Sequence, residues 1–187
     1  MTFRKLKISN IVFLVIIVLM LIPQTRQPIQ VAIQSVISKF SPSVIDKEDR
    51  KKIEYSSWNL RDLNGNEFNF RDAKGKVVFI NLWATWCPPC IAEFQSIQDL
   101  YHDYSENVVF LLVSDESPEV INAFLDKKGY IIQIFNPLTK YPEGLSSRSI
   151  PRTFIIDREG YLVVDKNGAA NWNSDKVREH LDELLIK

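Results

Sequence analysis

Cysteine and histidine are both scarce in this sequence, and their scarcity limits the kinds of site that it can form. The chain has two cysteines, Cys87 and Cys90, and two histidines, His102 and His180. A structural zinc site needs about four ligands, usually from two such cysteine pairs or from added histidines. A covalent haem site needs histidine directly after the second cysteine, but Ile91 stands there. These observations argue against both sites and leave a single cysteine pair to explain.

An excess of charge of either sign is absent as well. The 23 Lys and Arg residues balance 23 Asp and Glu residues. The sequence contains no basic patch that would indicate nucleic-acid binding, and no long run of like charge that would indicate a charged tail. With 187 residues, 45% of them hydrophobic, we expect one globular domain with a sizeable core plus an appendage.

The placement of the cysteine pair predicts its chemistry. An apolar run over residues 77–82 leads into the sequence WATWCPPC at 83–90, and a helical pattern follows. Cys87 would therefore lie at a helix N-terminus, where free N–H groups and the helix dipole stabilise a thiolate. Pro88 suits the first helical turn, and Cys90, one turn on, can resolve a mixed disulfide. The pattern predicts a redox-active dithiol; the alternative is a purely structural disulfide, although so short a loop gains little from closure.

Three stretches of the chain resemble a known family. They are residues 77–90, residues 149–157 with the sequence SIPRTFIID, and, more weakly, residues 168–172. They resemble the thioredoxin-fold proteins, and more narrowly the membrane-anchored TlpA-like and ResA-like thiol–disulfide oxidoreductases of bacteria, over residues 55–187. The resemblance implies an α/β thioredoxin fold, with a central mixed sheet flanked by helices and an N-terminal β-hairpin extension.

The resemblance also implies roles for residues near the dithiol. Cys87 would attack, Cys90 would resolve, and Glu93 would assist proton transfer beside the dithiol. Glu93 follows Cys90 by three residues and so shares its helix face, although spacing alone fits a surface glutamate equally well. Thioredoxin itself has a buried aspartate at the position of Asn81, so an asparagine here together with Glu93 follows the ResA-like pattern.

Substrate contacts are implied at two places. The Ile150–Pro151 bond would be cis, with this loop pairing to an extended substrate segment; the sequence alone does not support a cis bond. Arg152 stands where a small polar residue is common in the family. Trp86 and Pro88 would form the docking surface beside Cys87.

The remaining pattern predicts the secondary structure of the domain. Asn64-Gly65 indicates a hairpin, and continuous apolarity indicates buried strands at 77–82 and 108–113. Ser117-Pro118 indicates the start of a helix. Further expectations are a helix after the cysteine motif, a short strand at 130–135, a hairpin from 153–156 to 161–164, and a last amphipathic helix over 177–185.

The N-terminal region predicts a membrane anchor. Three basic residues, Arg4, Lys5 and Lys7, precede an apolar run over 11–22; counted from residue 6, it reaches roughly 25 Å at about 1.5 Å per residue. No small-x-small cleavage site follows. We therefore expect a cytoplasmic N-terminus and signal anchor at 1–25, an amphipathic helix and linker at 26–54, and a catalytic domain at 55–187 outside the cytoplasmic membrane. The amphipathic helix fits a spacer or a segment in the membrane interface.

Together these observations predict a thiol–disulfide oxidoreductase that acts on protein partners on the periplasmic side. The resemblance favours reducing work, with apocytochrome c thiols as one substrate and a membrane electron donor of the thiol-transfer type. We expect no cofactor, no metal ligand and no nucleic acid. The alternative is a Cu(I) metallochaperone, since thiolates suit that ion; such carriers usually add a methionine or histidine, and Met1 and Met20 both lie in the predicted anchor.

Overall fold

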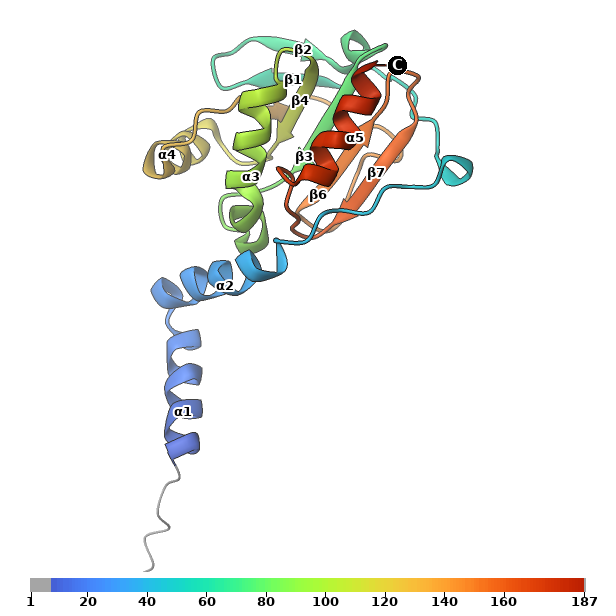
Figure 1. Ribbon diagram of the computed structural model, residues 1–187. Helices are drawn as coiled ribbons and strands as arrows, with labels where there is room; N and C mark the ends of the chain where they lie inside the picture. Colours follow the sequence, from blue (N-terminus) through green and yellow to red (C-terminus); the bar gives the residue numbers. More distant parts are fainter. Residues whose placement is uncertain (1–7, 187) are drawn as a thin grey trace, which may run out of the picture.

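The computed structural model describes residues 8–186 and is built around a seven-stranded mixed β-sheet (Figure 1). The strand order is β2-β1-β5-β4-β3-β6-β7. The strands are β1 Asn59–Asp62, β2 Glu67–Asn69, β3 Val77–Leu82, β4 Val108–Val113, β5 Ile134–Pro137, β6 Arg152–Ile156 and β7 Leu162–Asn167.

The two apolar runs form the centre of this sheet. β3 and β4 pair in parallel from Val77↔Val108 to Leu82↔Val113, and β6 pairs antiparallel on the other side of β3. Every residue of β3 is buried, because layers of side chains cover both faces of the strand. The predicted bounds of both strands are confirmed.

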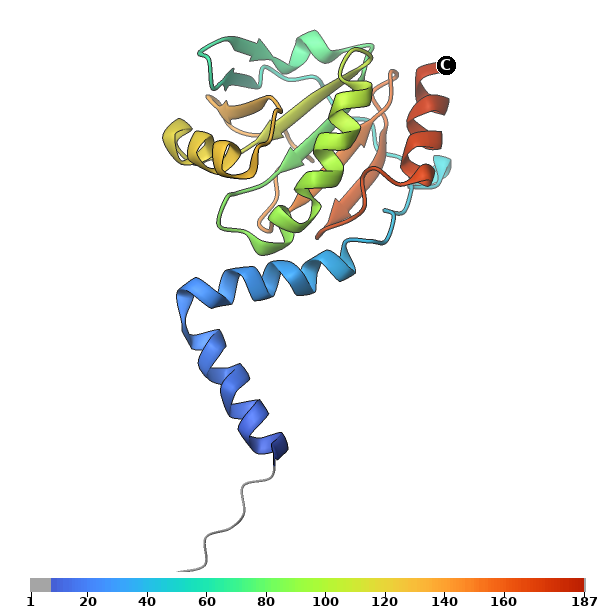
Figure 2. The ribbon, with the colours of Figure 1, turned by 60° about the vertical axis from the view of Figure 1, so that its left-hand side comes forward.

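Three helices follow the strands as predicted. They are α3 Pro88–Tyr104, α4 Pro118–Lys128 and α5 Asp175–Ile186. α3 and α5 lie on the same face of the sheet (Figures 1 and 2) and share one apolar cluster with the sheet residues beneath them. The apolar residues whose spacing predicted α3 are Ile91, Phe94, Ile97, Tyr101 and Tyr104. Four of them are buried, and Tyr101 is partly buried against the cluster.

Around this centre, the N-terminal hairpin is confirmed and one strand is displaced. β1 and β2 flank the turn at Asn64-Gly65, where Gly65 has a φ of 90°, a conformation that glycine adopts without steric cost. The strand expected at 130–135 begins instead at Ile134. The reason is local: the Ile131 N–H is bound by the Gln98 side chain and Tyr130 packs on Phe94, so sheet pairing starts later.

Two helices precede the domain. α1, Ile8–Leu21, and α2, Pro23–Ile37, meet at Ile22, so the boundary predicted between residues 25 and 26 falls inside α2. Within residues 8–186, no helix has the length and apolarity needed to cross a membrane. Figures 1 and 2 show α2 lying across the domain at the N-terminal end of α3.

The stretch expected as a linker up to residue 54 is partly built into the domain. The Ile45 N–H bonds to the Val163 carbonyl, and the Leu162 N–H bonds to the Lys51 carbonyl, both at 2.8 Å. Ile53 is buried. The sequence pattern did not predict this packing, because the residues between Ile45 and Ile53 are mostly charged and only isolated apolar residues mark the buried side.

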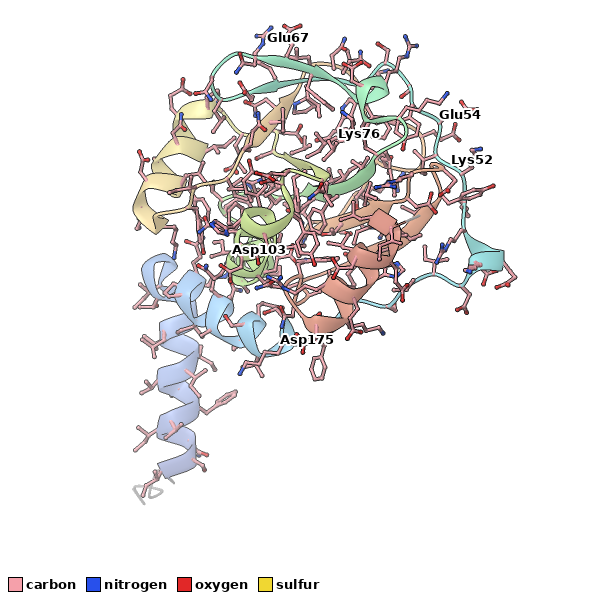
Figure 3. All side chains as sticks on the ribbon, turned by 45° about the horizontal axis from the view of Figure 1, so that its top comes forward. Lys52, Glu54, Glu67, Lys76, Asp103 and Asp175 are labelled. Carbon is pink, nitrogen blue, oxygen red and sulfur yellow. A yellow bond between two sulfur atoms is a disulfide. The ribbon has the colours of Figure 1, made fainter. Side chains whose placement is uncertain are left out.

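The charged side chains that Figure 3 labels come from separate parts of the domain. Lys52 and Glu54 lie in the segment before β1, Glu67 in β2, Asp103 in α3 and Asp175 in α5. Asp103 accepts a hydrogen bond from Arg178. This ion pair joins the exposed sides of α3 and α5 over the shared apolar cluster.

Two leucines allow the placement of the core to be tested. Leu112 of β4 is fully buried, whereas Leu138, just after β5, keeps 42% of its surface exposed. Leu112→Ala leaves a cavity and should lower the free energy of unfolding by about 2–5 kcal/mol. Leu138→Ala should lower it by about 0.5 kcal/mol or less. Chemical denaturation of the oxidised proteins measures both, and equal losses would contradict the core described here.

Candidate functional site

The two cysteines form a disulfide at the N-terminus of α3. The sulfurs are 2.08 Å apart and the Cα atoms 5.3 Å apart. Cys87 is the N-cap residue of α3, with Pro88 at the first helical position, and the Cys90 N–H points at the Cys87 sulfur at 3.3 Å. When the disulfide is reduced, this N–H and the helix dipole favour a thiolate at Cys87.

Both cysteines are nearly inaccessible in this oxidised form. Cys87 is 3% exposed and Cys90 is 1% exposed, whereas the neighbouring Trp86 is 65% exposed. The two sulfur-bearing residues therefore differ little in exposure while they are joined in the disulfide. Trp86 presents a large apolar surface directly beside Cys87.

The cis bond expected from the resemblance is present between Ile150 and Pro151. Pro151 immediately precedes β6, whose Arg152 pairs with Leu82 at the end of β3. Ile150 packs against the cluster that contains Cys87 and Cys90. The cis-proline loop and the dithiol therefore lie at the same edge of the sheet.

Arg152, the departure from the family pattern, is bound within the protein. Its guanidinium makes two hydrogen bonds to Asp165 of β7, at 2.6 and 2.8 Å, and lies over the Phe154 ring. The Pro151 carbonyl likewise accepts from the Gly168 N–H at 3.0 Å. Both contacts tie the cis-proline loop to β7.

Glu93 is not a surface residue. It is 1% exposed, and its carboxylate accepts hydrogen bonds from Asn81 Nδ2 at 2.9 Å, the Ala170 N–H at 3.0 Å and Trp172 Nε1 at 2.8 Å. Burial raises the pKa of Glu93 to about 7, although these bonds and the charge of Lys166 act in the opposite direction. A carboxyl group that titrates near neutral pH, one helical turn from Cys90, suits proton exchange with that thiol.

The sequence pattern did not indicate a second carboxylate that lies near the dithiol. Glu116, between β4 and α4, accepts from the Thr85 N–H at 2.6 Å and from the Thr85 hydroxyl at 2.7 Å. The Asn136 side chain in turn donates to the Glu116 carbonyl at 2.8 Å. These contacts hold the loop that ends at Cys87. No motif spacing connects residues 85 and 116, so only the pairing of β3 with β4 brings them together.

The position of α2 was also not anticipated. The Gln27 side chain donates to the Thr85 carbonyl at 3.3 Å, and a groove of about 670 Å³ separates α2 from the cysteine loop. Trp86 and Pro88 line this groove together with Ile33. α2 was expected as a spacer or as a membrane-interface segment, but here it lies beside the predicted docking surface.

Metal ligands do not gather at this site in the part of the chain that is described. Residues 8–186 contain no group of three or more His, Cys, Asp or Glu side chains placed to hold a metal ion. His102 lies near the far end of α3, with its side chain paired to Asp103.

The buried carboxyl predicts how stability depends on pH. Glu93 is protonated in the native protein up to a pKa of about 7, against an ordinary value of 4.5. Between these values the unfolded chain loses the proton first, so the free energy of unfolding should fall as pH rises, by about 1.4 kcal/mol per pH unit and about 3 kcal/mol in all. Glu93→Gln should remove this fall.

Urea unfolding of the oxidised protein between pH 4 and 8 measures the effect. Glu106→Gln, a change at an exposed glutamate of the turn after α3, is the matched control and should unfold like the wild type. Parallel stability curves for the wild type and Glu93→Gln would show that the carboxyl has an ordinary pKa.

With this geometry established, comparison with known proteins identifies the family. Residues 35–184 match the Redoxin family. The thiol-disulfide oxidoreductase ResA of Halalkalibacterium halodurans is 33% identical over 129 residues, which cover 67% of this chain and 72% of the relative. ResA of Bacillus thuringiensis subsp. konkukian is 29% identical over 156 residues, covering 75% and 81%.

A solved structure shows the same fold. The thiol:disulfide interchange protein of Chlorobium tepidum superposes with a TM-score of 0.58 at 22% identity, over 73% of this chain and 99% of that one. The chain therefore belongs to the Redoxin family, and it is a thioredoxin-like thiol–disulfide oxidoreductase.

Proposed function

We propose that this protein reduces disulfides in partner proteins outside the cytoplasmic membrane. The observation that carries the proposal is the Cys87–Cys90 pair at the N-terminus of α3, with a buried carboxyl one turn further along the helix. The reducing direction is supported by the resemblance to ResA-like proteins and by the pair Pro88-Pro89, which lacks the histidine that marks strongly oxidising relatives. Apocytochrome c thiols are one proposed product.

The reaction proceeds by two exchanges. The Cys87 thiolate attacks one sulfur of the partner's disulfide, forming a mixed disulfide and releasing the other partner sulfur as a thiolate, which takes a proton. Cys90 then gives its proton to the Glu93 carboxylate and attacks the Cys87 sulfur. The second exchange forms the Cys87–Cys90 disulfide and releases the second partner sulfur as a thiolate, which takes the proton held by Glu93 and completes the reduced partner. A membrane protein of the thiol-transfer type then returns two electrons and two protons to the pair.

Two surfaces hold the partner chain in this scheme. The backbone at Ile150 and Pro151 pairs with an extended segment, while Trp86 and Pro88 provide an apolar contact beside Cys87. Trp86 suits this role because its ring is large, rigid and exposed.

We propose that residues 1–25 anchor the protein in the cytoplasmic membrane. α1 is apolar on all sides and exposes its large side chains, including Ile8 at 80% and Phe13 at 66%. A helix that is hydrophobic all round is typically buried in a protein core or in a membrane. The basic residues Arg4, Lys5 and Lys7 precede it and favour a cytoplasmic N-terminus, so we propose that the catalytic domain lies outside.

The described site offers nothing that favours the copper-carrier alternative. Residues 8–186 contain no group of three or more His, Cys, Asp or Glu side chains placed to hold a metal ion. Exchange chemistry uses the same two cysteines together with Glu93.

The two cysteines should differ in a trapping experiment. In Cys90→Ala the mixed disulfide between Cys87 and a partner cannot be resolved, so partner proteins should remain attached and be released by a reductant. In Cys87→Ala the remaining thiol is buried in the helix and should trap few partners. Non-reducing gels of both variants, purified from cells under identical alkylation, measure the difference. Equal trapping by the two variants would contradict these roles.

The proposed anchor predicts the behaviour of the intact protein. The full-length chain should sediment with membranes, resist extraction by high salt and carry a C-terminus that added protease reaches in intact spheroplasts. A cytoplasmic marker protein, which protease should not reach, is the control. Recovery of a soluble species whose N-terminus lies after residue 23 would exclude a retained anchor.

A further inference from the structure

The Glu93 carboxylate is held by donors from two other parts of the chain. Asn81, in β3, donates to Oε1, while the Ala170 N–H and the Trp172 indole N–H, in the segment between β7 and α5, donate to Oε2. We propose that Trp172, with Asn81, is a positioning residue of the exchange reaction: its indole N–H holds the Glu93 carboxylate in place and favours the ionised form that accepts the Cys90 proton. This inference rests on the proposed role of Glu93.

Trp172 is fixed to the same turn of α3 at two points. Its side chain donates to Glu93 Oε2 at 2.8 Å, and its backbone N–H donates to the Ser96 hydroxyl at 3.2 Å. That hydroxyl donates to the Glu93 carbonyl at 2.7 Å. The ring is fully buried and packs edge-on against Phe79, with centroids 5.2 Å apart. The indole therefore has no room to turn away from the carboxylate.

The hydrogen bond has an electrostatic consequence. A bond from N–H to an ionised carboxylate is stronger than a bond between neutral groups, so each donor stabilises the charged form over the protonated one. Two other groups act on the carboxyl: Lys166 of β7, whose charge also favours ionisation, and the Cys90 thiol on the same helix when the protein is reduced. Without the indole donor, the carboxylate would remain buried with less compensation.

Trp58 shows that a buried tryptophan in this protein need not serve a carboxylate. It is also fully buried, in the cluster on the other side of the sheet, and its indole N–H has no protein partner among the described residues. Replacing Trp58 or Trp172 by Phe removes the same atoms from a packed core. Only the change at Trp172 removes a donor from Glu93, so the pair separates positioning from packing.

Asn81 offers a second, independent variant. Its amide nitrogen donates to Glu93 Oε1 at 2.9 Å and to the Thr153 hydroxyl at 2.8 Å. Thr153 lies in β6, two residues after Pro151. Asn81→Leu keeps a similar volume and removes the donor, so it should change the ionisation of Glu93 in the same direction as Trp172→Phe.

The test follows the full-length protein from pH 6 to pH 10. The rate of insulin disulfide reduction is measured for the wild type, Trp172→Phe, Asn81→Leu, Trp58→Phe and Glu93→Gln. In parallel, the ¹³C shift of the Glu93 carboxyl is followed with pH in the oxidised proteins that retain Glu93. The inflection that Glu93→Gln removes identifies the carboxyl in the rate profile.

Loss of one donor should move this inflection, and the NMR titration, upward by about one to two pH units. The rate at pH 7 should fall about five-fold or more and return to the wild-type value above the shifted inflection. Trp58→Phe should leave the midpoint unchanged. If Trp172→Phe does not fold, the midpoint of Asn81→Leu decides the same question.

Two outcomes would overturn the inference. One is a Trp172→Phe rate that is lowered by the same factor at every pH, with an unmoved NMR midpoint; the other is an equal shift in Trp58→Phe, which would assign the effect to packing. If the proposed proton transfer itself is wrong, the experiment gives a different result. In that case the rate profile of Glu93→Gln would superimpose on the wild type, whatever the NMR midpoints show.

Discussion

A carboxyl group inside an apolar core requires donors from its surroundings, and this requirement organises the site. Burying an ionised carboxylate without partners is strongly unfavourable. Glu93 meets the requirement with Asn81 from β3 and with Ala170 and Trp172 from the chain between β7 and α5. The carboxyl that we propose to serve the dithiol is thus also the point where α3 is fastened to the sheet and to the C-terminal segment.

The loop before the dithiol is fixed by a separate set of contacts. Glu116 accepts both Thr85 donors on one side, and Gln27 of α2 donates to the Thr85 carbonyl on the other. Thr85 therefore connects the reactive loop to the β4–α4 connection and to the helix that precedes the domain. The chemistry at Cys87 depends on this loop because Cys87 must remain the N-cap residue for its thiolate to benefit from the end of α3.

The sequence predicted the central elements well because their signals are local. Continuous apolar runs predicted both ends of β3 and of β4 correctly. The placement of the cysteines before a helical pattern predicted the start of α3. The failures concern contacts between distant residues. Spacing could not distinguish a buried Glu93 from a surface one, nor pair Thr85 with Glu116. For the same reason, the sequence did not predict that residues 45–53 pack along β7 or where α2 lies. Both features follow from tertiary contacts.

The pairing of Asn81 with Glu93 explains why this site needs an asparagine on the strand. Thioredoxin has an aspartate at the matching position, and here Nδ2 of Asn81 lies 2.9 Å from Glu93 Oε1. Two carboxylates at that distance could not both ionise, because like charges that close strongly raise one pKa. With a helix carboxylate in place, the strand residue must donate rather than accept. Asn81 does so towards both Glu93 and Thr153, so the site keeps one acid a helical turn from Cys90 while the strand contributes a hydrogen-bond donor.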